Sequence, residues 1–289
     1  MLEELLNIIK KYNEIYIIGH KNPDADSIFS SIILENILKY FNINAKAIIL
    51  EDFIYSENDI DIMNEYLVNK PTIINKKLLK DKNIILVDHN DPIQSTLDTS
   101  YNIIGSIDHH MESNLVYTLS GIYTSTALYI YDLFKDIYNF NEYEKNLIAL
   151  ATMTDSEYLT TTRFTNNDKK IYDSLDIILN IEEIRTKYFK TTNFDIEPII
   201  NIKNNHKVYN IENININRTM IKAYEKDNKY IDDYLNTIKE LDNKWFIIWN
   251  EYDTKKTYIY YNNKLIKTYD YIITNSVLIL KELIKDNLI

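Results

Sequence analysis

The segment Gly19-His20-Lys21-Asn22-Pro23-Asp24-Ala25-Asp26-Ser27-Ile28 joins an apolar run, Ile15–Ile18, to an amphipathic stretch. The same arrangement occurs twice more, at Val87-Asp88-His89-Asn90 after the run 84–87 and at Asp108-His109-His110 after the run 103–107. Four of the five histidines of the chain lie in these three segments. Apolar runs that each end in a polar loop, with helical patterns between them, are typical of a parallel sheet with a site at the carboxyl ends of its strands.

The pattern of apolar residues along the whole chain predicts two domains. In residues 1–190 it predicts strands at 15–19, 45–50, 84–87 and 102–107 and helices at 26–40, 125–134, 143–153, 167–180 and 182–189. The segment 190–198 lacks periodicity and marks the boundary. In residues 191–289 the pattern predicts strands at 208–214, 245–249 and 256–261 and helices at 221–241 and 275–285. We therefore expect an α/β protein, with a mostly parallel N-terminal sheet flanked by helices and a smaller mixed α/β C-terminal domain.

The composition narrows the classes of function. The 289 residues include no cysteine, which excludes disulfides and thiolate ligands within the chain and fits a reducing compartment. The formal net charge is −11, so we expect no basic surface field for nucleic acid. No apolar run approaches the about 20 residues of a membrane helix, and the acidic start of the chain does not resemble a secretory signal. We expect a cytoplasmic protein without a membrane partner, and a homodimer is left open.

The first polar segment contains three candidate metal ligands. Pro23 fixes a turn after the strand, so His20 and Asp24 can converge on one ion while Asp26 points to a second. Asp26 also precedes a predicted helix, so capping of that helix is the alternative. Asp88 follows a buried strand at the edge of the sheet, where its carboxylate can bridge two ions or cap a loop.

Three further positions are candidates on similar grounds. The side chains of the adjacent residues His109 and His110 diverge on an irregular segment, so one can bind an ion while the other faces the substrate; a surface pair is the alternative. Asp155 ends an apolar helix, where a carboxylate opposes the helix dipole unless a cation compensates it. A turn-forming aspartate is the alternative there. For His89 a structural hydrogen bond is favoured over metal ligation.

The ligand types indicate the metal and the reaction. Imidazole and carboxylate ligands without thiolates suit two divalent ions such as Mn²⁺ or Co²⁺ better than Mg²⁺ alone, and entry of Mg²⁺ with the substrate is left open. Two such ions about 3.5–4 Å apart hold a bridging water as hydroxide, which attacks phosphorus in line. The residues therefore predict a hydrolase of phosphoesters or phosphoanhydrides.

The N-terminal part of the chain, to about residue 180, resembles the DHH phosphoesterase superfamily and, within it, the family II, manganese-type inorganic pyrophosphatases and their exopolyphosphatase relatives. Five ordered blocks carry the resemblance: GHKNPDADSI, VDHNDPIQS, SIDHH, TSTALYIYDLF and ATMTDSEYLTTTRFTNNDKK. The resemblance implies that His20 and Asp24 hold the first ion. It implies that Asp26, His109 and Asp155 hold the second ion.

The resemblance also assigns roles in catalysis. It implies that Asp88 bridges the two ions and is one of two catalytic residues. The other is His110, which would contact the electrophilic phosphate or the leaving group and so also bind the substrate. Asp108 would orient a histidine without binding metal itself.

The second domain fits the resemblance less completely. The glycine-rich GGGH block of the nuclease-like members is absent, because no glycine follows Gly121. The resemblance implies a phosphate-binding lysine before a strand, which is Lys207, with Lys190 as a competitor. A C-terminal Ser-Arg-Lys block has no counterpart, since no arginine follows Arg218. We therefore expect a second domain of the DHH-associated type that is truncated at its C-terminus, and slower hydrolysis of diphosphate or a different substrate.

Together these features predict metal-dependent hydrolysis of a phosphoanhydride, with inorganic pyrophosphate as the leading member of a class of small phosphate-containing substrates. An exopolyphosphatase is one alternative, since Lys76, Lys77, Lys80 and Lys82 form a basic run. A nucleotide or oligonucleotide phosphodiesterase is a second. A metal-binding regulatory homologue with weak catalytic power is a third.

Overall fold

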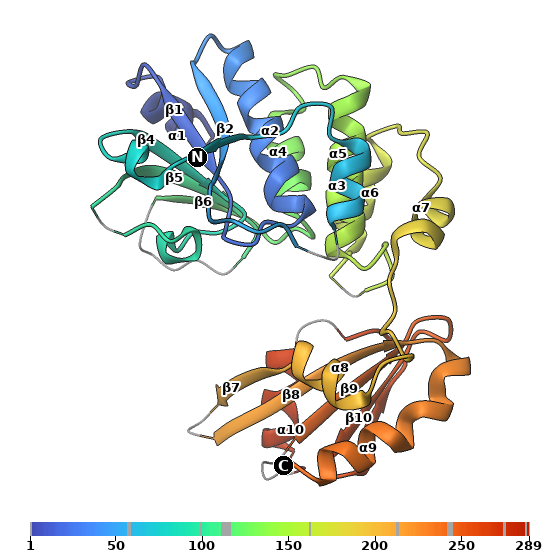
Figure 1. Cartoon of the computed structure of the whole chain (residues 1–289). Coiled ribbons are helices and arrows are strands. Elements are labelled where there is room, and N and C mark those ends of the chain that lie inside the picture. Colours follow the sequence, from blue (N-terminus) through green and yellow to red (C-terminus); the bar gives the residue numbers. More distant parts are fainter. Residues whose placement is uncertain are drawn as a thin grey trace. The chain divides into compact units, whose positions relative to one another are not determined.

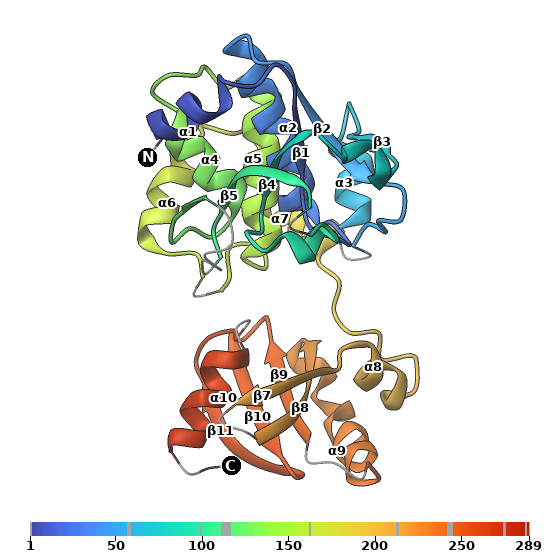
Figure 2. The ribbon, with the colours of Figure 1, turned by 90° about the vertical axis from the view of Figure 1, so that its left-hand side faces the viewer.

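The computed structural model consists of two compact units (Figures 1 and 2). The first unit is Met1–Leu159 with Arg163–Tyr188, and the second is Thr160–Thr162 with Phe189–Ile289. The division after Tyr188 lies two residues before the expected boundary at 190. No sequence pattern indicated that Thr161 joins the second unit, where it forms a parallel bridge with Ile272. The structure describes residues 2–56, 59–98, 100–110, 117–161, 163–211, 214–241, 245–273, 276–286 and 288.

The first unit is built on a six-stranded sheet with the strand order β3-β2-β1-β4-β5-β6. Every pairing in this sheet is parallel, which confirms the expected mostly parallel sheet. The strands are β1 (Ile15–Ile18), β2 (Ala45–Leu50), β3 (Thr72–Ile74), β4 (Asn83–Val87), β5 (Asn102–Asp108) and β6 (Thr118–Ser120). The sequence pattern missed β3 and β6, because runs of three residues are too short to show periodicity.

Helices cover the sheet of the first unit. Three of them, α2, α4 and α5, pack against one another side by side (Figure 1). The predicted helix at 167–180 is too long: α6 ends at Asp173, and Asp176 has a φ of 51°, a left-handed conformation that stops a helix. The helices are α1 (Leu2–Ile9), α2 (Ala25–Tyr40), α3 (Ile60–Tyr66), α4 (Thr126–Phe134), α5 (Glu142–Asp155), α6 (Asn166–Asp173) and α7 (Ile181–Tyr188), with short 3₁₀ helices η1 (Lys76–Leu79) and η2 (Pro92–Ser95).

The central strands β1 and β4 are mostly apolar, as expected for a sheet that is covered on both faces. One face carries a buried cluster made of strand residues together with Leu79 from η1 and Leu97 from the turn after η2. Helix α2 is buried on nearly every side, since it touches the sheet as well as α4 and α5. This packing fixes the loop between β1 and α2, in which the first polar segment lies. The strand members of the cluster are Ile18, Ile48, Leu50, Ile84 and Leu86.

The second unit has a mixed sheet with the strand order β11-β10-β9-β8-β7, in which only β8 and β9 pair in parallel. Helix α10 contributes Leu280 and Leu283 to the core on one face, and α8 and α9 contribute Ile202 and Tyr234 to the core on the other. The smaller mixed α/β fold is thereby confirmed. Its elements are α8 (Pro198–Asn204), β7 (Lys207–Ile211), β8 (Ile214–Ala223), η3 (Glu225–Tyr230), α9 (Ile231–Lys239), β9 (Trp245–Glu251), β10 (Lys256–Tyr261), β11 (Lys264–Tyr269) and α10 (Ser276–Lys285).

Two predicted elements of the second unit were wrong. The single strand expected at 208–214 is a hairpin of β7 and β8, and the helix expected at 221–241 is confined to Ile231–Lys239. Ile221 and Ala223 belong to β8 and enter the same buried cluster, as alternate residues of a strand do. Residue 275, where the last helix was expected to begin, lies outside the described residues. In the described part of the chain, no helix has both the length and the apolar character needed to cross a bilayer.

The packing of α2 on α5 generates a testable expectation. Buried Glu144 in α5 accepts hydrogen bonds from Asn36 Nδ2 of α2 at 2.9 Å and from Tyr138 Oη at 2.7 Å. Glu144→Ala leaves those partly buried donors without this acceptor and is expected to lower the free energy of unfolding by about 1–3 kcal/mol. Glu142→Ala, on the exposed side of the same turn, is the control and is expected to change it by less than about 1 kcal/mol. Denaturant unfolding measures both, and equal effects would contradict the assigned role.

Candidate metal centre

Polar side chains from three neighbouring strands and two helices meet at the carboxyl edge of the first sheet. His20 lies in the loop after β1, Asp88 directly follows β4, and His109 follows β5. Asp26 lies in the first turn of α2, and Asp155 is the last residue of α5. These side chains form groups in which atoms able to bind a metal lie within 4.8 Å of one another. The sequence predicted each of these residues as a ligand.

The first group consists of His20, Asp24 and Asp88. His20 Nε2 lies 3.6 Å from Asp24 Oδ2 and 3.2 Å from Asp88 Oδ2. The other ring nitrogen, Nδ1, lies 3.0 Å from the carbonyl oxygen of Lys21. A proton on Nδ1 satisfies that carbonyl and leaves the Nε2 lone pair facing the two carboxylates, which is the tautomer that a metal ligand needs.

The second group consists of Asp26, His109 and Asp155. His109 Nε2 lies 3.4 Å from Asp155 Oδ2 and 4.0 Å from Asp26 Oδ2. Its Nδ1 lies 3.0 Å from the carbonyl oxygen of Tyr123, so it too can present a free Nε2. That Nε2 atom is buried and has no hydrogen-bond partner among the described residues. A buried ring nitrogen that faces several carboxylates is an arrangement that a divalent cation would satisfy.

Asp88 connects the two groups. Its Oδ2 faces His20, and its Oδ1 lies 3.3 Å from His109 Nε2, so the two oxygens of one carboxylate address different groups. The residue is buried and has a φ of 61°, a left-handed conformation that is uncommon for aspartate. Thr126 Oγ1 donates to Oδ1 at 3.2 Å. The backbone thus turns sharply at the end of β4 and directs this carboxylate between the groups.

Asp26 is held by the N-terminus of α4 and does not cap α2. The cap of α2 is Asp24, whose Oδ1 accepts a hydrogen bond from Ser27 N at 3.0 Å, so the alternative role for Asp26 was wrong. Asp26 accepts hydrogen bonds from Thr126 N at 2.7 Å and Ala127 N at 2.9 Å. Free N–H groups at a helix start favour a carboxylate. Sequence reasoning missed Thr126, although Ser125-Thr126 before an apolar run is the signature of such a start.

The electrostatics of the centre reflect several carboxylates in a confined, buried space. Burial and the charge of Asp88 raise the pKa of Asp26, and burial and the charge of Asp26 raise the pKa of Asp155. Burial also acts against ionisation of Asp88, but contact with His109 and His20 outweighs it and holds the pKa of Asp88 well below its usual range. Positive charge beside them, from protonated imidazoles or from a bound cation, favours ionisation of all three together.

In the two histidines, contact with the carboxylates raises the pKa and so favours the charged form. Burial lowers the pKa of His20, but hydrogen bonding to Asp24 and Asp88 outweighs this and raises the pKa to about 12. For His109, burial is again outweighed, by contact with Asp88 and the charge of Asp155, and its pKa rises to about 10. The two imidazoles carry protons that balance part of the carboxylate charge, and a divalent ion would replace those protons.

Two more of the expected residues surround the groups. Asp108 Oδ1 lies 2.8 Å from His110 Nδ1, and its Oδ2 accepts a hydrogen bond from Asn90 Nδ2 at 2.6 Å. This geometry suits the expected orienting role of Asp108. His89 is buried, and its Nδ1 lies 2.8 Å from the carbonyl oxygen of Val87. Burial lowers the pKa of His89 to about 4, so it stays neutral beside the cluster.

The expected phosphate-binding lysines lie in the second unit. Both Lys190 and Lys207 are exposed, and Lys207 begins β7 opposite Arg218 of β8. Their role in binding substrate stays a prediction.

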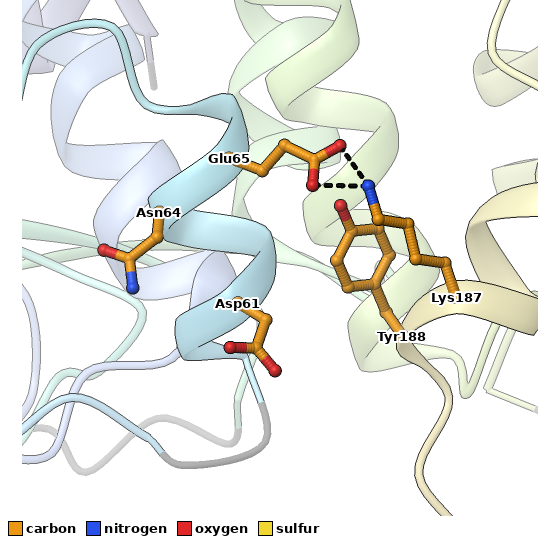
Figure 3. Close-up of a pocket in the computed structure, with 5 residues that line it drawn as sticks. All are labelled: Asp61, Asn64, Glu65, Lys187 and Tyr188. Carbon is orange, nitrogen blue, oxygen red and sulfur yellow. Dashed lines mark hydrogen bonds and ion pairs between the residues drawn. The ribbon is translucent and has the colours of Figure 1, made fainter.

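An open pocket of about 470 Å³ lies apart from these groups, between α3 and α7 (Figure 3). Asp61, Asn64, Glu65, Lys187 and Tyr188 line it. Lys187 Nζ is 2.6 Å and 2.5 Å from the two carboxylate oxygens of Glu65. Because Glu65 already neutralises this lysine, the pocket offers no cation for a phosphate.

Metal binding is expected to release protons and to tighten as the pH rises. His20 and His109, with pKa values raised to about 12 and about 10, hold protons at neutral pH in the metal-free protein. A divalent ion must displace them, so its apparent affinity should increase between about pH 6 and about pH 8. Calorimetric titration with Mn²⁺ in buffers of different ionisation enthalpy counts the released protons. An affinity that is constant or falls with rising pH would contradict this electrostatic account.

Comparison with known proteins agrees with the sequence motifs. Residues 14–155 match the DHH family, N-terminal domain. The chain is 29% identical to the manganese-dependent inorganic pyrophosphatase of Methanocaldococcus jannaschii over 257 residues, which cover 80% of each protein. It is also 29% identical, over 203 residues, to a Staphylococcus epidermidis protein named probable manganese-dependent inorganic pyrophosphatase, covering 65% of this chain and 64% of that protein.

Solved structures share the fold. A Methanococcus jannaschii protein described as a family II inorganic pyrophosphatase superposes with a TM-score of 0.60 at 21% identity, covering 86% of both chains. An exopolyphosphatase-related protein from Bacteroides fragilis superposes with a TM-score of 0.56 at 17% identity, covering 90% of this chain and 82% of that one. At these identities the likeness establishes the fold. The match of residues 14–155 to the N-terminal domain of the DHH family agrees with this shared fold.

Proposed function

We propose that the protein hydrolyses inorganic pyrophosphate with two divalent metal ions held at the edge of the first sheet. The observation that carries the proposal is the position of Asp88, whose two carboxylate oxygens lie 3.2 Å from His20 Nε2 and 3.3 Å from His109 Nε2. A carboxylate shared in this way suits a pair of ions better than one. The names of the similar proteins support pyrophosphate as substrate and Mn²⁺ as metal.

The residues assigned to each ion follow from the two groups. His20, Asp24 and Asp88 would hold one ion, and Asp26, His109, Asp155 and Asp88 the other. Two ions so held would lower the pKa of a shared water and stabilise the charge that develops on phosphate oxygens. Co²⁺ suits the same mixed ligands, and Mg²⁺ can accompany the substrate.

The net reaction adds one water to one phosphorus and breaks its bond to the bridging oxygen. The leaving phosphate takes up a proton, and two phosphates result. His110 is suited to act on this leaving group, because its side chain is about half exposed and Asp108 holds its Nδ1 at 2.8 Å. Its Nε2 is then left for a phosphate oxygen. Lys207 and Lys190 of the second unit are the proposed phosphate-binding cations.

Polyphosphate as the preferred substrate has less support. Of the four lysines in the run at 76–82, Lys76 donates to the carbonyl oxygen of Thr96, and Lys82 pairs with Glu14 at 2.9 Å. Both thus have structural partners. A phosphodiester substrate and a regulatory role without turnover are outcomes that the assay below distinguishes. The cytoplasmic location and the homodimer stay predictions.

The shared carboxylate gives a direct test of the two-ion proposal. Asp88→Ala removes a ligand from both groups, so the variant is expected to lose both ions and all activity. Asp91→Ala is the matched control, because Asp91 caps η2 through Ile93 N and belongs to neither group. Elemental analysis after dialysis against Mn²⁺ gives the metal content of each. Two Mn²⁺ retained per chain in Asp88→Ala would exclude the shared role.

The substrate is tested with the Mn²⁺-loaded protein by measuring the released phosphate, or the released nitrophenol for a nitrophenyl phosphodiester, since cleavage of a diester yields a monoester and no free phosphate. Pyrophosphate is expected to be the best substrate among pyrophosphate, tripolyphosphate, long-chain polyphosphate and a nitrophenyl phosphodiester. No arginine follows Arg218 in the sequence. Because removing a cationic clamp typically costs on the order of 10²–10³ in rate, we expect slower turnover than in a pyrophosphatase that carries a C-terminal Ser-Arg-Lys block. Preference for long polyphosphate or for the diester would replace the proposed substrate. Metal binding without turnover of any of them would favour the regulatory alternative.

A further inference from the structure

The orientation of His109 depends on one backbone carbonyl. His109 Nδ1 lies 3.0 Å from the oxygen of Tyr123, which selects the tautomer with a proton on Nδ1 and a lone pair on Nε2. Nε2 is the atom that faces Asp88 and Asp155, at 3.3 Å and 3.4 Å. If the Tyr123 carbonyl moves, both the tautomer and the direction of the ring are lost. The way in which Tyr123 is anchored therefore bears on the metal centre.

Tyr123 is anchored through its side chain to helix α4. Its hydroxyl donates to Asp132 Oδ2 at 2.6 Å. Its ring stacks on the ring of Tyr129, with centroids 4.5 Å apart and an angle of 23° between the planes. Asp132 Oδ1 meanwhile pairs with Lys135 Nζ at 2.6 Å, so each carboxylate oxygen has one partner that fixes it. A tyrosine held at both ring and hydroxyl leaves its own backbone little freedom.

Gly121 makes this stack possible. A Cβ atom at residue 121 would lie 2.6 Å from Tyr123 Cε2 and 3.2 Å from Tyr129 Cε2. Both atoms belong to stacked rings that cannot turn aside separately. The carbonyl of Gly121 also accepts a hydrogen bond from Tyr123 N at 3.1 Å. One of the three glycines of the chain is thus used to let Tyr123 approach α4.

Helix α4 consequently reaches both sides of the second group. Its first N–H groups bind Asp26, and Tyr129 and Asp132 in its second turn hold the tyrosine whose carbonyl binds His109. We propose that Tyr123 and Asp132 are positioning residues for His109 and set the metal affinity of the group Asp26, His109 and Asp155. This inference rests on the metal centre of the proposed function and assigns residues that bind no metal themselves.

The test compares variants that remove the anchor without touching a ligand. Tyr123→Phe keeps the ring stack and removes the hydroxyl, so it is expected to weaken binding of one of two Co²⁺ ions by about 10–100-fold and leave the other unchanged. Asp132→Ala should act alike, and Asp132→Asn should retain affinity because its amide oxygen can accept the same hydrogen bond. Tyr131→Phe is the matched control, since that hydroxyl on α4 bonds instead to Ser174 O at 3.2 Å.

Two measurements separate positioning from general destabilisation. Calorimetric titration gives the two Co²⁺ affinities, and the visible absorption of bound Co²⁺ reports the ligand geometry. A changed spectrum in Tyr123→Phe and Asp132→Ala, with that of Tyr131→Phe unchanged, supports the proposal even if all variants unfold more easily. If the wild type binds two ions and both anchor variants bind them as tightly with the same spectrum, the positioning role is wrong while the metal centre stands. A wild type that binds no Co²⁺ overturns both.

Discussion

The electrostatic repulsion among Asp26, Asp88 and Asp155 is the constraint on which the rest of the first unit depends. The side chains of Asp26 and Asp88 are buried, and Asp155 is largely shielded, so water screens their charges poorly. The fold supplies imidazoles and several N–H and hydroxyl donors to these carboxylates, and the contacts given above for them involve no lysine or arginine. The missing positive charge must then come from protons or from metal ions. The parallel sheet is the cause of this crowding, because the carboxyl ends of adjacent strands bring the side chains together at one edge.

Two helices act on the same group in opposite ways. Asp26 meets the first N–H groups of α4, where the helix dipole favours a negative charge even without metal. Asp155 ends α5, where the dipole disfavours a negative charge, and it depends on His109 or a cation for compensation. The charge of Asp26 is therefore compensated in part by the scaffold, whereas the charge of Asp155 depends more closely on His109 or on a bound cation. The difference arises from the direction of the two helices and not from residue type.

The sequence predicted the first unit better than the second for physical reasons. His20, Asp88 and His109 follow apolar strands, and the change from an apolar run to polar residues is visible in the sequence. The ends of these strands could therefore be predicted. Backbone partners leave no such pattern, so the hydrogen bonds of Asp26 to α4 and of His109 to Tyr123 were invisible in the sequence. In the second unit, apolar and polar residues alternate along β8, which ends at Ile221–Ala223. The pattern of these last residues is equally compatible with the start of a helix. Tertiary packing in the mixed sheet decided between the two.

The bridge between Thr161 and Ile272 limits how the chain can be divided into fragments that each keep a whole unit. Since Thr160 and Thr161 belong to the second unit while Arg163 returns to the first, the polypeptide crosses from one unit to the other three times. No single cut yields two pieces that each contain a whole unit. A fragment that stops near residue 190 would keep Thr161, which lies six residues after Asp155, and would lose Ile272, with which Thr161 pairs. The second unit, expressed from residue 189 onward, would lack the same bridge on its side. Each unit is compact by itself, and the two are interleaved in sequence.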